Sequence, residues 1–380
     1  MRIINAKVYG ADLKFHEGEI LIRNGRFADP LAADEEAEEI IDAGGAYALP
    51  GFIDLHFHGC LGYDFCDGTR EAVSEIAKYE ASVGVTAICP ATMTLSVEEL
   101  ESVLKNAADY RKDPEADGAD LVGINMEGPF ISQVKKGAQN GAYIIPCSAE
   151  IAGRFIDASE GLVKYIGLAP EDNPDFEAFI TAVKDRARIS LAHTNADYST
   201  AKAAFDAGAS HAVHLFNAMP AFTHREPGVV GAVSDSPHVY AEIIADGVHI
   251  HPSMVRAAFK MNTPERMILI SDSLRAAGMP DGEYVLGGLA ITKQGRYCRL
   301  VEGGNLAGSV SPLPDCVRTV VRDMEIPLET AIACGTINPA KSLGIDAEYG
   351  SIEIGKKGNV VLWNEDMSQK AVIKDGRVIA

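Results

Sequence analysis

The stretch that decides the fold is Pro50-Gly51-Phe52-Ile53-Asp54-Leu55-His56-Phe57-His58-Gly59. Its sequence predicts a turn, then an apolar strand from Phe52 to Phe57, then a glycine that ends the strand. His56 and His58 are two residues apart, and alternate residues of a strand point to the same face. Two imidazoles on one face can bind a divalent metal. On this motif alone, the alternative to a metal site is an ordinary pair of polar residues at the end of a strand.

The composition is that of a globular protein of one or two domains. The chain has 380 residues, of which 47% are hydrophobic and 23% are charged, and this length allows a large core. The net charge of −20 argues against nucleic acid and anionic membrane surfaces as partners. An anionic substrate would therefore need a local cationic pocket.

The cysteines and the hydropathy pattern favour a cytoplasmic protein. Seven cysteines are scattered without a C-x-x-C pair, which is typical of buried thiols in a reducing compartment. Cys60 follows His58 closely, so we expect this thiol to be the one that faces the site. The first residues contain no apolar signal-peptide segment, and the sequence has no run of 18 apolar residues, so we expect neither a signal peptide nor a transmembrane span.

Both ends of the chain carry strand patterns. The turn pairs Asn24-Gly25 and Asp375-Gly376 are typical of tight hairpins, and the acidic run 34–39 between the N-terminal strands is interpreted as a solvated loop. We infer that both ends pair into one small β-sandwich domain, residues 1–49 plus 350–380. The predicted strands are Arg2–Tyr9, Glu19–Arg23, Glu39–Asp42, Gly350–Gly355, Asn359–Trp363, Ala371–Ile373 and Val378–Ile379.

Residues 50–349 alternate apolar strands with amphipathic helices. Thr69 can begin a helix that ends at Gly84, and Ser96 with Glu99 forms a capping box; further helices are predicted at 176–187 and 199–207. Eight such strands favour a closed parallel (β/α)8 barrel over an open sheet. The absence of a G-x-G-x-x-G motif after a strand argues against dinucleotide binding. The predicted strands are Phe52–Phe57, Val85–Pro90, Leu121–Met126, Val163–Leu168, Ile189–Ala192, His211–Val213, Val239–Ala245 and Met267–Ser271.

Polar residues lie where the predicted barrel strands end. In barrel enzymes, the active-site residues lie at these carboxyl ends of the strands. Any one of them alone fits a hydrogen-bonded core or rim residue, but together they form a ligand set for zinc or a similar metal. We interpret His16, His211 and His238, which lack such placement, as ordinary structural histidines. The converging residues are His56, His58, Glu127, His193, His214 and Asp272.

The chain resembles the amidohydrolase superfamily and, within it, the family of N-acetylglucosamine-6-phosphate deacetylases. The stretch Pro50–Gly59 is similar to the superfamily's first barrel strand. The stretch Asn338-Pro339-Ala340, followed by residues 350–366, resembles the C-terminal segment that the superfamily shares. The block Glu127-Gly128-Pro129-Phe130, together with His214-Leu215-Phe216-Asn217-Ala218-Met219, is specific to the deacetylases. The other matching blocks are Lys135–Gln139, His193–Asn195, Asp246–His249, Ser271–Ser273, Ala276–Gly282 and Leu306–Ser309.

The resemblance implies roles for individual residues. Glu127, His193 and His214 would bind the principal divalent metal, and Asp272 would be the catalytic carboxylate. His56 and His58 allow a second metal, with Glu127 as the bridging carboxylate, so one or two ions per subunit are expected. Zinc is the expected ion, and iron, manganese and cobalt also suit these donors. The implied substrate-binding residues are Ala138, Gln139, Asn217, Ala218, Arg225, His249, Leu306, Ala307, Gly308 and Ser309.

The implied reaction is hydrolysis of the N-acetyl amide of N-acetylglucosamine 6-phosphate to glucosamine 6-phosphate and acetate, in amino-sugar metabolism. The resemblance also implies a homodimer, and we expect the loop that carries Arg225 to serve the partner's site. Gln139 stands where other members carry a histidine, so electrophilic assistance would come from the metal or another donor. Three alternatives stay open: an N-acetylgalactosamine-6-phosphate deacetylase, a deaminase or cyclic amidase of the superfamily, and a barrel that acts only as a scaffold.

Overall fold

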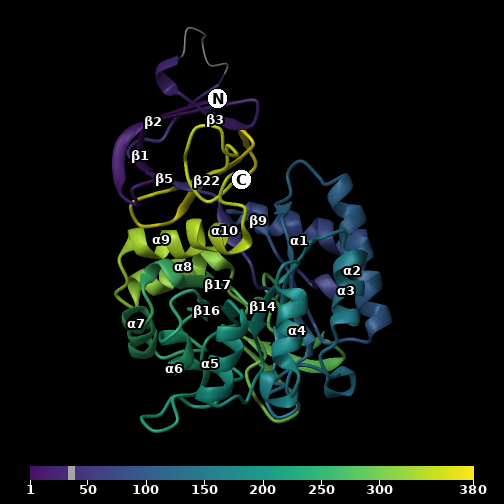
Figure 1. Ribbon diagram of the computed structural model, residues 1–380. Helices are drawn as coiled ribbons and strands as arrows, with labels where there is room; N and C mark the ends of the chain where they lie inside the picture. The colour runs from purple at the N-terminus through teal and green to yellow at the C-terminus, as the bar shows by residue number, and fades with distance from the viewer. Residues whose placement is uncertain (33–38) are drawn as a thin grey trace.

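The computed structural model describes residues 1–32 and 39–380. It consists of a barrel surrounded by helices and a smaller sheet that contains both chain termini (Figure 1). The predicted acidic loop falls largely on residues 34–38, which lie outside the described residues. Among the described residues, helices of sufficient length and apolarity to cross a bilayer are absent.

The small sheet is built around β1 (Arg2–Tyr9), which pairs antiparallel with β2 and parallel with both β4 and β5. The antiparallel pair of β5 and β21 joins the N-terminal and C-terminal strands, as the sequence predicts. The sheet runs in the order β23-β22-β21-β5-β1-β2-β3. Its other strands are β2 (Phe15–Arg23), β3 (Arg26–Ala28), β4 (Ile40–Asp42), β5 (Tyr47–Pro50), β21 (Val360–Trp363), β22 (Gln369–Lys374) and β23 (Arg377–Val378).

The two predicted hairpin turns are confirmed. Asn24 and Gly25 have φ values of 49° and 73°, and Asp375 and Gly376 have φ values of 47° and 76°. Positive φ at both central residues matches the right-handed twist of the flanking strands and favours Asn, Asp and Gly. The strands enclose a core of their own that includes Ile3, Ile22 and Phe27 from the N-terminal strands and Val360, Leu362 and Ile373 from the C-terminal ones. The domain boundaries at residues 49 and 350 stay a prediction.

The barrel strands pair in parallel in chain order, and this confirms the predicted (β/α)8 barrel with a small domain made from both termini. Two backbone hydrogen bonds close the ring between its last and first strands: Asp272 N–H donates to the His56 carbonyl (2.9 Å), and His58 N–H to the Ser273 carbonyl (2.7 Å). The strands are β6 (Phe52–Asp54), β9 (Val85–Ile88) continued by β10 (Ala91–Thr92), β11 (Asp120–Leu121) continued by β12 (Ile124–Phe130), β13 (Val163–Leu168), β14 (Arg188–Leu191), β15 (His211–Ala212), β16 (Tyr240–Ile244) and β17 (Met267–Ile270).

The helices cover the outside of the barrel (Figure 1). The Thr69 side chain accepts from the Ala72 N–H, and Ser96 and Glu99 form the predicted capping box. The helices are α1 (Arg70–Ser82), α2 (Val97–Lys112), α3 (Ala149–Ala158), α4 (Phe176–Val183), α5 (Tyr198–Ala207), α6 (Gly228–Ser234), α7 (Pro252–Met261), α8 (Leu313–Arg322), α9 (Leu328–Gly335) and α10 (Ile337–Leu343).

Packing of β21 joins the small sheet to the barrel. Val360 and Leu362 point into the core of the small sheet, whereas Val361 and Trp363 point into the main core. The Trp363 ring lies 5.3 Å from the Phe52 ring, centroid to centroid. Because alternate residues of one strand serve the two cores, the barrel and the small sheet share β21 as a wall.

Two strand predictions are wrong, one of them in part, and one sheet was not predicted. Residues 350–355 form no strand but bends followed by a turn at 354–355, and Ile354 is 69% exposed, so the apolar alternation there does not mark a buried face. The first barrel strand ends at Asp54, three residues before Phe57. A three-stranded antiparallel sheet after the last barrel strand was not predicted. Its strands are β18 (Gly282–Leu286), β19 (Leu289–Gln294) and β20 (Tyr297–Leu300).

Candidate metal centre and substrate cavity

The six residues predicted to converge lie together at the carboxyl ends of the barrel strands, all of them buried. Glu127 lies within β12, and His56 and His58 follow the end of β6. His193, His214 and Asp272 come just after their strands and have φ values of 44°, 30° and 48°. Positive φ is costly for non-glycine residues and clusters at functional sites.

Glu127, His193 and His214 form the first group. The Nε2 atoms of both histidines lie 2.9 Å from Glu127 Oε1 and 3.3 Å from each other. The opposite ring nitrogens are held by backbone carbonyls: His193 Nδ1 by Lys135 (2.8 Å) and His214 Nδ1 by Asn217 (3.1 Å). Such contacts place the proton on Nδ1 and leave the Nε2 lone pairs facing each other, as a metal centre requires.

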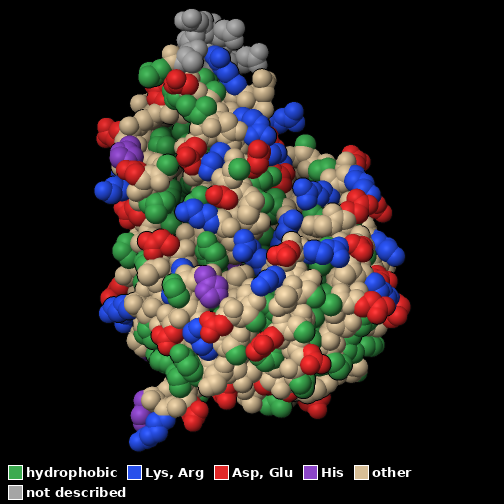
Figure 2. Space-filling model, viewed as in Figure 1, with side chains coloured by type: hydrophobic (Ala, Val, Ile, Leu, Met, Phe, Trp, Pro, Cys, Tyr) green, Lys and Arg blue, Asp and Glu red, His purple; other side chains and the backbone are tan. Residues whose placement is uncertain are grey.

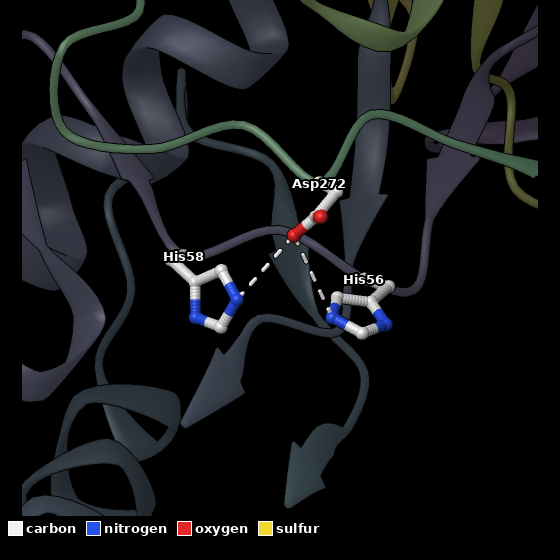
Figure 3. A group of neighbouring side chains, drawn as sticks. All are labelled: His56, His58 and Asp272. Atoms are coloured by element: carbon white, nitrogen blue, oxygen red, sulfur yellow. Dashed lines mark ion pairs between the residues drawn. The ribbon is translucent and has the colours of Figure 1, made fainter. Parts of the chain in front are cut away.

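His56, His58 and Asp272 form the second group, and both imidazoles point at one carboxylate oxygen (Figure 3). Asp272 Oδ1 lies 3.4 Å from His58 Nε2 and 3.7 Å from His56 Nε2. Glu127 stands between the groups, with Oε1 3.4 Å from His56 Nε2 and Oε2 3.4 Å from His58 Nε2. The geometry therefore suits one or two metal ions, with Glu127 reaching both.

The residues fit a divalent cation. His56 Nε2 is buried and has no hydrogen-bond partner among the described residues, although buried polar atoms are normally satisfied. Burial would raise the pKa of the Glu127 carboxyl, but His193 and His214 hold it well below its usual range. Burial likewise opposes ionisation of Asp272, yet His58 and His56 lower its pKa. Two ionised carboxylates and four imidazoles in one buried space are a donor set for zinc or a similar metal.

A cavity of about 450 Å³ opens onto these groups. Most of the predicted substrate-binding residues line it, and they are Ala138, Gln139, Asn217, Ala218, His249, Leu306, Ala307 and Gly308. The His249 Nδ1 lies 2.8 Å from Asp246 Oδ2. Burial would lower the pKa of this imidazole, but the hydrogen bond and charge of Asp246 raise it above its ordinary value. The cavity therefore offers an imidazole near the metal groups whose protonated form is favoured by Asp246.

A family model described as the Amidohydrolase family matches residues 47–379. The chain belongs to the amidohydrolase family. This family is metal-dependent, in keeping with the two groups of metal-binding side chains.

Several amidohydrolases are similar to this chain over nearly its full length. N-acetylglucosamine-6-phosphate deacetylase of Vibrio furnissii is 36% identical over 342 residues, which are 90% of this chain and 85% of that protein. N-acetylgalactosamine-6-phosphate deacetylase of Escherichia coli O157:H7 is 32% identical over 349 residues, 92% of this chain and 90% of that protein. The crystal structure of N-acetylglucosamine-6-phosphate deacetylase from Pasteurella multocida superposes with a TM-score of 0.91 at 28% identity, covering 99% of this chain and 98% of that one.

Two residues predicted to bind substrate lie elsewhere in this amidohydrolase chain. Ser309 is buried behind the cavity wall, where its N–H donates to the Asp272 carbonyl (2.8 Å) and its Oγ donates to the Ser271 carbonyl (2.5 Å). It thereby supports the segment that carries Asp272. Arg225 is exposed in the loop between β15 and α6, which extends from the molecule and presents basic and histidine side chains at its tip (Figures 1 and 2). Its expected role in a partner's site stays a prediction.

The Gln139 side chain forms a hydrogen bond with Glu127. Its Oε1 accepts a hydrogen bond from the Thr94 N–H (2.7 Å), and its Nε2 donates to Glu127 Oε2. The amide is therefore held at both ends within the cavity wall. It orients the carboxylate that lies between the two groups, a role that the sequence did not suggest.

Sequence reasoning missed Lys135 and Glu242 and misplaced Cys60. Lys135 lines the cavity, and its Nζ donates to the Met219 carbonyl (3.0 Å). Glu242 is fully buried in β16 and contacts His56. The signal for Glu242 was present, because a carboxylate inside the apolar strand Tyr240–Ile244 needs a buried partner. Cys60 packs in the barrel core and does not line the cavity.

Proposed function

We propose that the protein hydrolyses the N-acetyl amide of N-acetylglucosamine 6-phosphate to glucosamine 6-phosphate and acetate. The observation that carries the proposal is the meeting of Glu127, His193, His214 and Asp272 at one cavity that also holds cationic groups. The names of the relatives at 30% identity and above support it. An amide needs an activated water and stabilisation of the developing negative charge.

Glu127, His193 and His214 would hold the principal ion, for which zinc is our proposal, and His56, His58 and Asp272 a second one. Such an ion, when bound, lowers the pKa of water and polarises the substrate carbonyl. Asp272 is ionised and reaches into the cavity, so it can take the proton from the attacking water and return it to the leaving amine. Gln139 and the backbone carbonyls behind His193 and His214 keep the ligands oriented.

The cationic groups of the cavity support a phosphorylated substrate. Lys135 is the one lysine or arginine among the described lining residues, and His249 adds an imidazole with a raised pKa. Lys135 Nζ contacts the carbonyl of Met219, the residue that follows the lining residues Asn217 and Ala218. We propose that this end of the cavity binds the phosphate. Its binding energy would then position the amide at the reacting end.

The proposal includes a homodimer in which Arg225 reaches the partner's cavity. Its exposed loop supports this arrangement, since the loop projects beyond its own barrel (Figure 1). Light scattering tests the oligomeric state, and mixing Arg225→Ala subunits with Asp272→Asn subunits tests the sharing of sites. Recovery of activity in the mixed dimers supports a shared site; a fully active monomer contradicts it.

Acetate release from the purified protein tests the function, with N-acetylglucosamine 6-phosphate, its unphosphorylated form and N-acetylgalactosamine 6-phosphate as substrates. The galactosamine isomer is a specific second candidate because one relative is named for it. We expect fast release from a phosphorylated sugar and one or two metal equivalents by elemental analysis. Equal rates on the unphosphorylated sugar, or protein that is folded and active without metal, would contradict the proposal.

A further inference from the structure

A buried carboxylate lies behind His56, on the side of the ring that faces away from the cavity. Glu242 Oε2 is 2.7 Å from His56 Nδ1, and the side chains of both residues are fully buried. The opposite ring nitrogen, Nε2, faces Glu127 and Asp272. The His56 ring therefore lies between the buried Glu242 carboxylate on one side and the cavity with Glu127 and Asp272 on the other.

Glu242 is surrounded by hydrogen-bond donors. Oε2 also accepts from the His214 backbone N–H (3.2 Å), and Oε1 lies 2.8 Å from His211 Nε2 and 3.4 Å from Asn125 Nδ2. A carboxylate in this position can only accept, so His56 must carry its proton on Nδ1. Its Nε2 lone pair is then directed toward Glu127 and Asp272.

Among the four candidate histidine ligands, His56 is the one that a carboxylate holds from behind. The Nδ1 atoms of His193 and His214 contact backbone carbonyls, which carry no net charge. The Nδ1 atom of His58 is buried without a hydrogen-bond partner in the described part of the chain. A carboxylate behind an imidazole fixes the tautomer and makes Nε2 a stronger donor.

We propose that Glu242 is the positioning residue for a second metal ion, held by His56, His58 and Asp272. Through His56 it would determine whether this group binds an ion, whereas the group of Glu127, His193 and His214 would bind its ion without it. The inference rests on the metal-dependent function proposed above, but it concerns only the second ion.

The rival interpretation makes Glu242 part of a purely structural network. From Glu242 the hydrogen bonds continue through His211 to Ser342 (Nδ1 to Oγ, 3.3 Å) and on to the Tyr165 hydroxyl (2.8 Å). A structural role would affect folding and both metal groups alike. The proposed role affects one metal and acts through the ring of His56, because Glu242 contacts His214 only at its backbone N–H and the His214 ring is held by the Asn217 carbonyl.

Metal binding to Glu242→Gln separates the two interpretations. Glutamine keeps the shape but offers one acceptor oxygen and no charge to these donors. Loss of such an outer partner typically weakens metal affinity about 10- to 100-fold. We expect this loss for the weaker of two Zn²⁺ equivalents in a chelator competition, with the tighter one unchanged. The matched control, Ser342→Ala, interrupts the network beyond His211 and should keep both affinities.

A double-mutant comparison identifies the route of the effect. In a His56→Asn protein, which should hold one ion, adding Glu242→Gln should leave the affinity of that ion unchanged. The inference would be overturned if Glu242→Gln weakened the binding of this remaining ion by the factor seen for the weaker ion in the otherwise wild-type protein. It would also be overturned if Glu242→Gln alone left both affinities unchanged. A wild-type protein with one ion overturns the inference but leaves the proposed function intact, whereas a wild-type protein without metal overturns both.

A measurement on the wild-type protein does not depend on the variant's folding. In protein with ¹⁵N-labelled histidine, we expect the His56 ring, assigned by its disappearance in His56→Asn, to be protonated on Nδ1 both with and without Zn²⁺. A His56 ring protonated on Nε2 in the metal-loaded protein would refute the role of Glu242.

Discussion

Replacing Lys135 with methionine tests the cationic end of the cavity. The Lys135 carbonyl orients His193, and the substitution keeps this carbonyl because it changes only the side chain. Within the described ranges, the side chain Nζ has one hydrogen-bond partner, the Met219 carbonyl at 3.0 Å, so two of its three donor positions remain for a phosphate. The effect should therefore fall on the binding of a phosphorylated substrate and leave the reacting end unchanged.

The magnitude follows from the kind of contact that is lost. A hydrogen bond to a charged group contributes about 1.5–3 kcal/mol, and each 1.36 kcal/mol corresponds to about a factor of ten. We therefore expect the KM for N-acetylglucosamine 6-phosphate to rise about 10- to 150-fold. Any fall in kcat should be smaller than the rise in KM, because the lost ammonium contact is to the phosphate and not to the reacting amide.

The assay is acetate release from the phosphorylated and the unphosphorylated sugar. Lys136→Met is the matched control, since Lys136 is the neighbouring lysine and does not line the cavity. On the unphosphorylated sugar, Lys135→Met should behave as the wild type. Equal increases in KM for both sugars, or equal effects of the Lys135 and Lys136 variants, would refute the reasoning.

Three further predictions address the reacting group, the pH profile and the core. Asp272→Asn should lower kcat about 10²- to 10⁴-fold while elemental analysis still finds the ion of Glu127, His193 and His214; undiminished turnover would remove Asp272 from the mechanism. The hydrogen bond and charge of Asp246 raise the pKa of His249 above its ordinary value, so its cationic form persists to higher pH than that of a free imidazole and is lost as pH rises through that pKa. The KM for the phosphorylated sugar should accordingly increase on the alkaline side, and a His249→Gln enzyme that keeps the same increase would contradict this assignment. Phe52→Ala should destabilise the protein by about 3–5 kcal/mol in urea unfolding, because Phe52 is buried against Trp363; an unchanged midpoint would show that this contact does not stabilise the fold.

The barrel could be predicted from the sequence because its strands are short apolar runs with helix caps between them. The placement of Glu127, His193, His214 and Asp272 followed, since parallel strands bring their carboxyl ends to one mouth. The segment 350–355 misled the strand prediction because its apolar alternation is not matched by burial. There, Gly355 N–H donates to the Phe27 carbonyl, and Phe27 N–H to the Lys356 carbonyl, so the segment forms a turn beside β3.

The contacts of polar side chains were the part that sequence could not supply. Gln139 lies in the cavity loop that follows β12, and its partner Glu127 lies in that strand, but its other partner, Thr94, belongs to the preceding barrel unit. Glu242 lies on the strand next to His211 and His214, but its contact with His56 needs closure of the ring. Hydrophobic patterns predict which face a residue occupies, whereas a hydrogen-bond partner depends on distances that only the assembled barrel fixes.

The shared wall between the small sheet and the barrel has a consequence for synthesis. β5 lies between β1 and β21, and Pro50 pairs with Val360, which emerges from the ribosome only after the whole barrel. Until then, the β5 edge that will accept β21 is unpaired, and such edges are where chains associate wrongly. The nascent chain therefore carries an open strand edge for most of its translation, and β21, which covers it, is made only after the whole barrel.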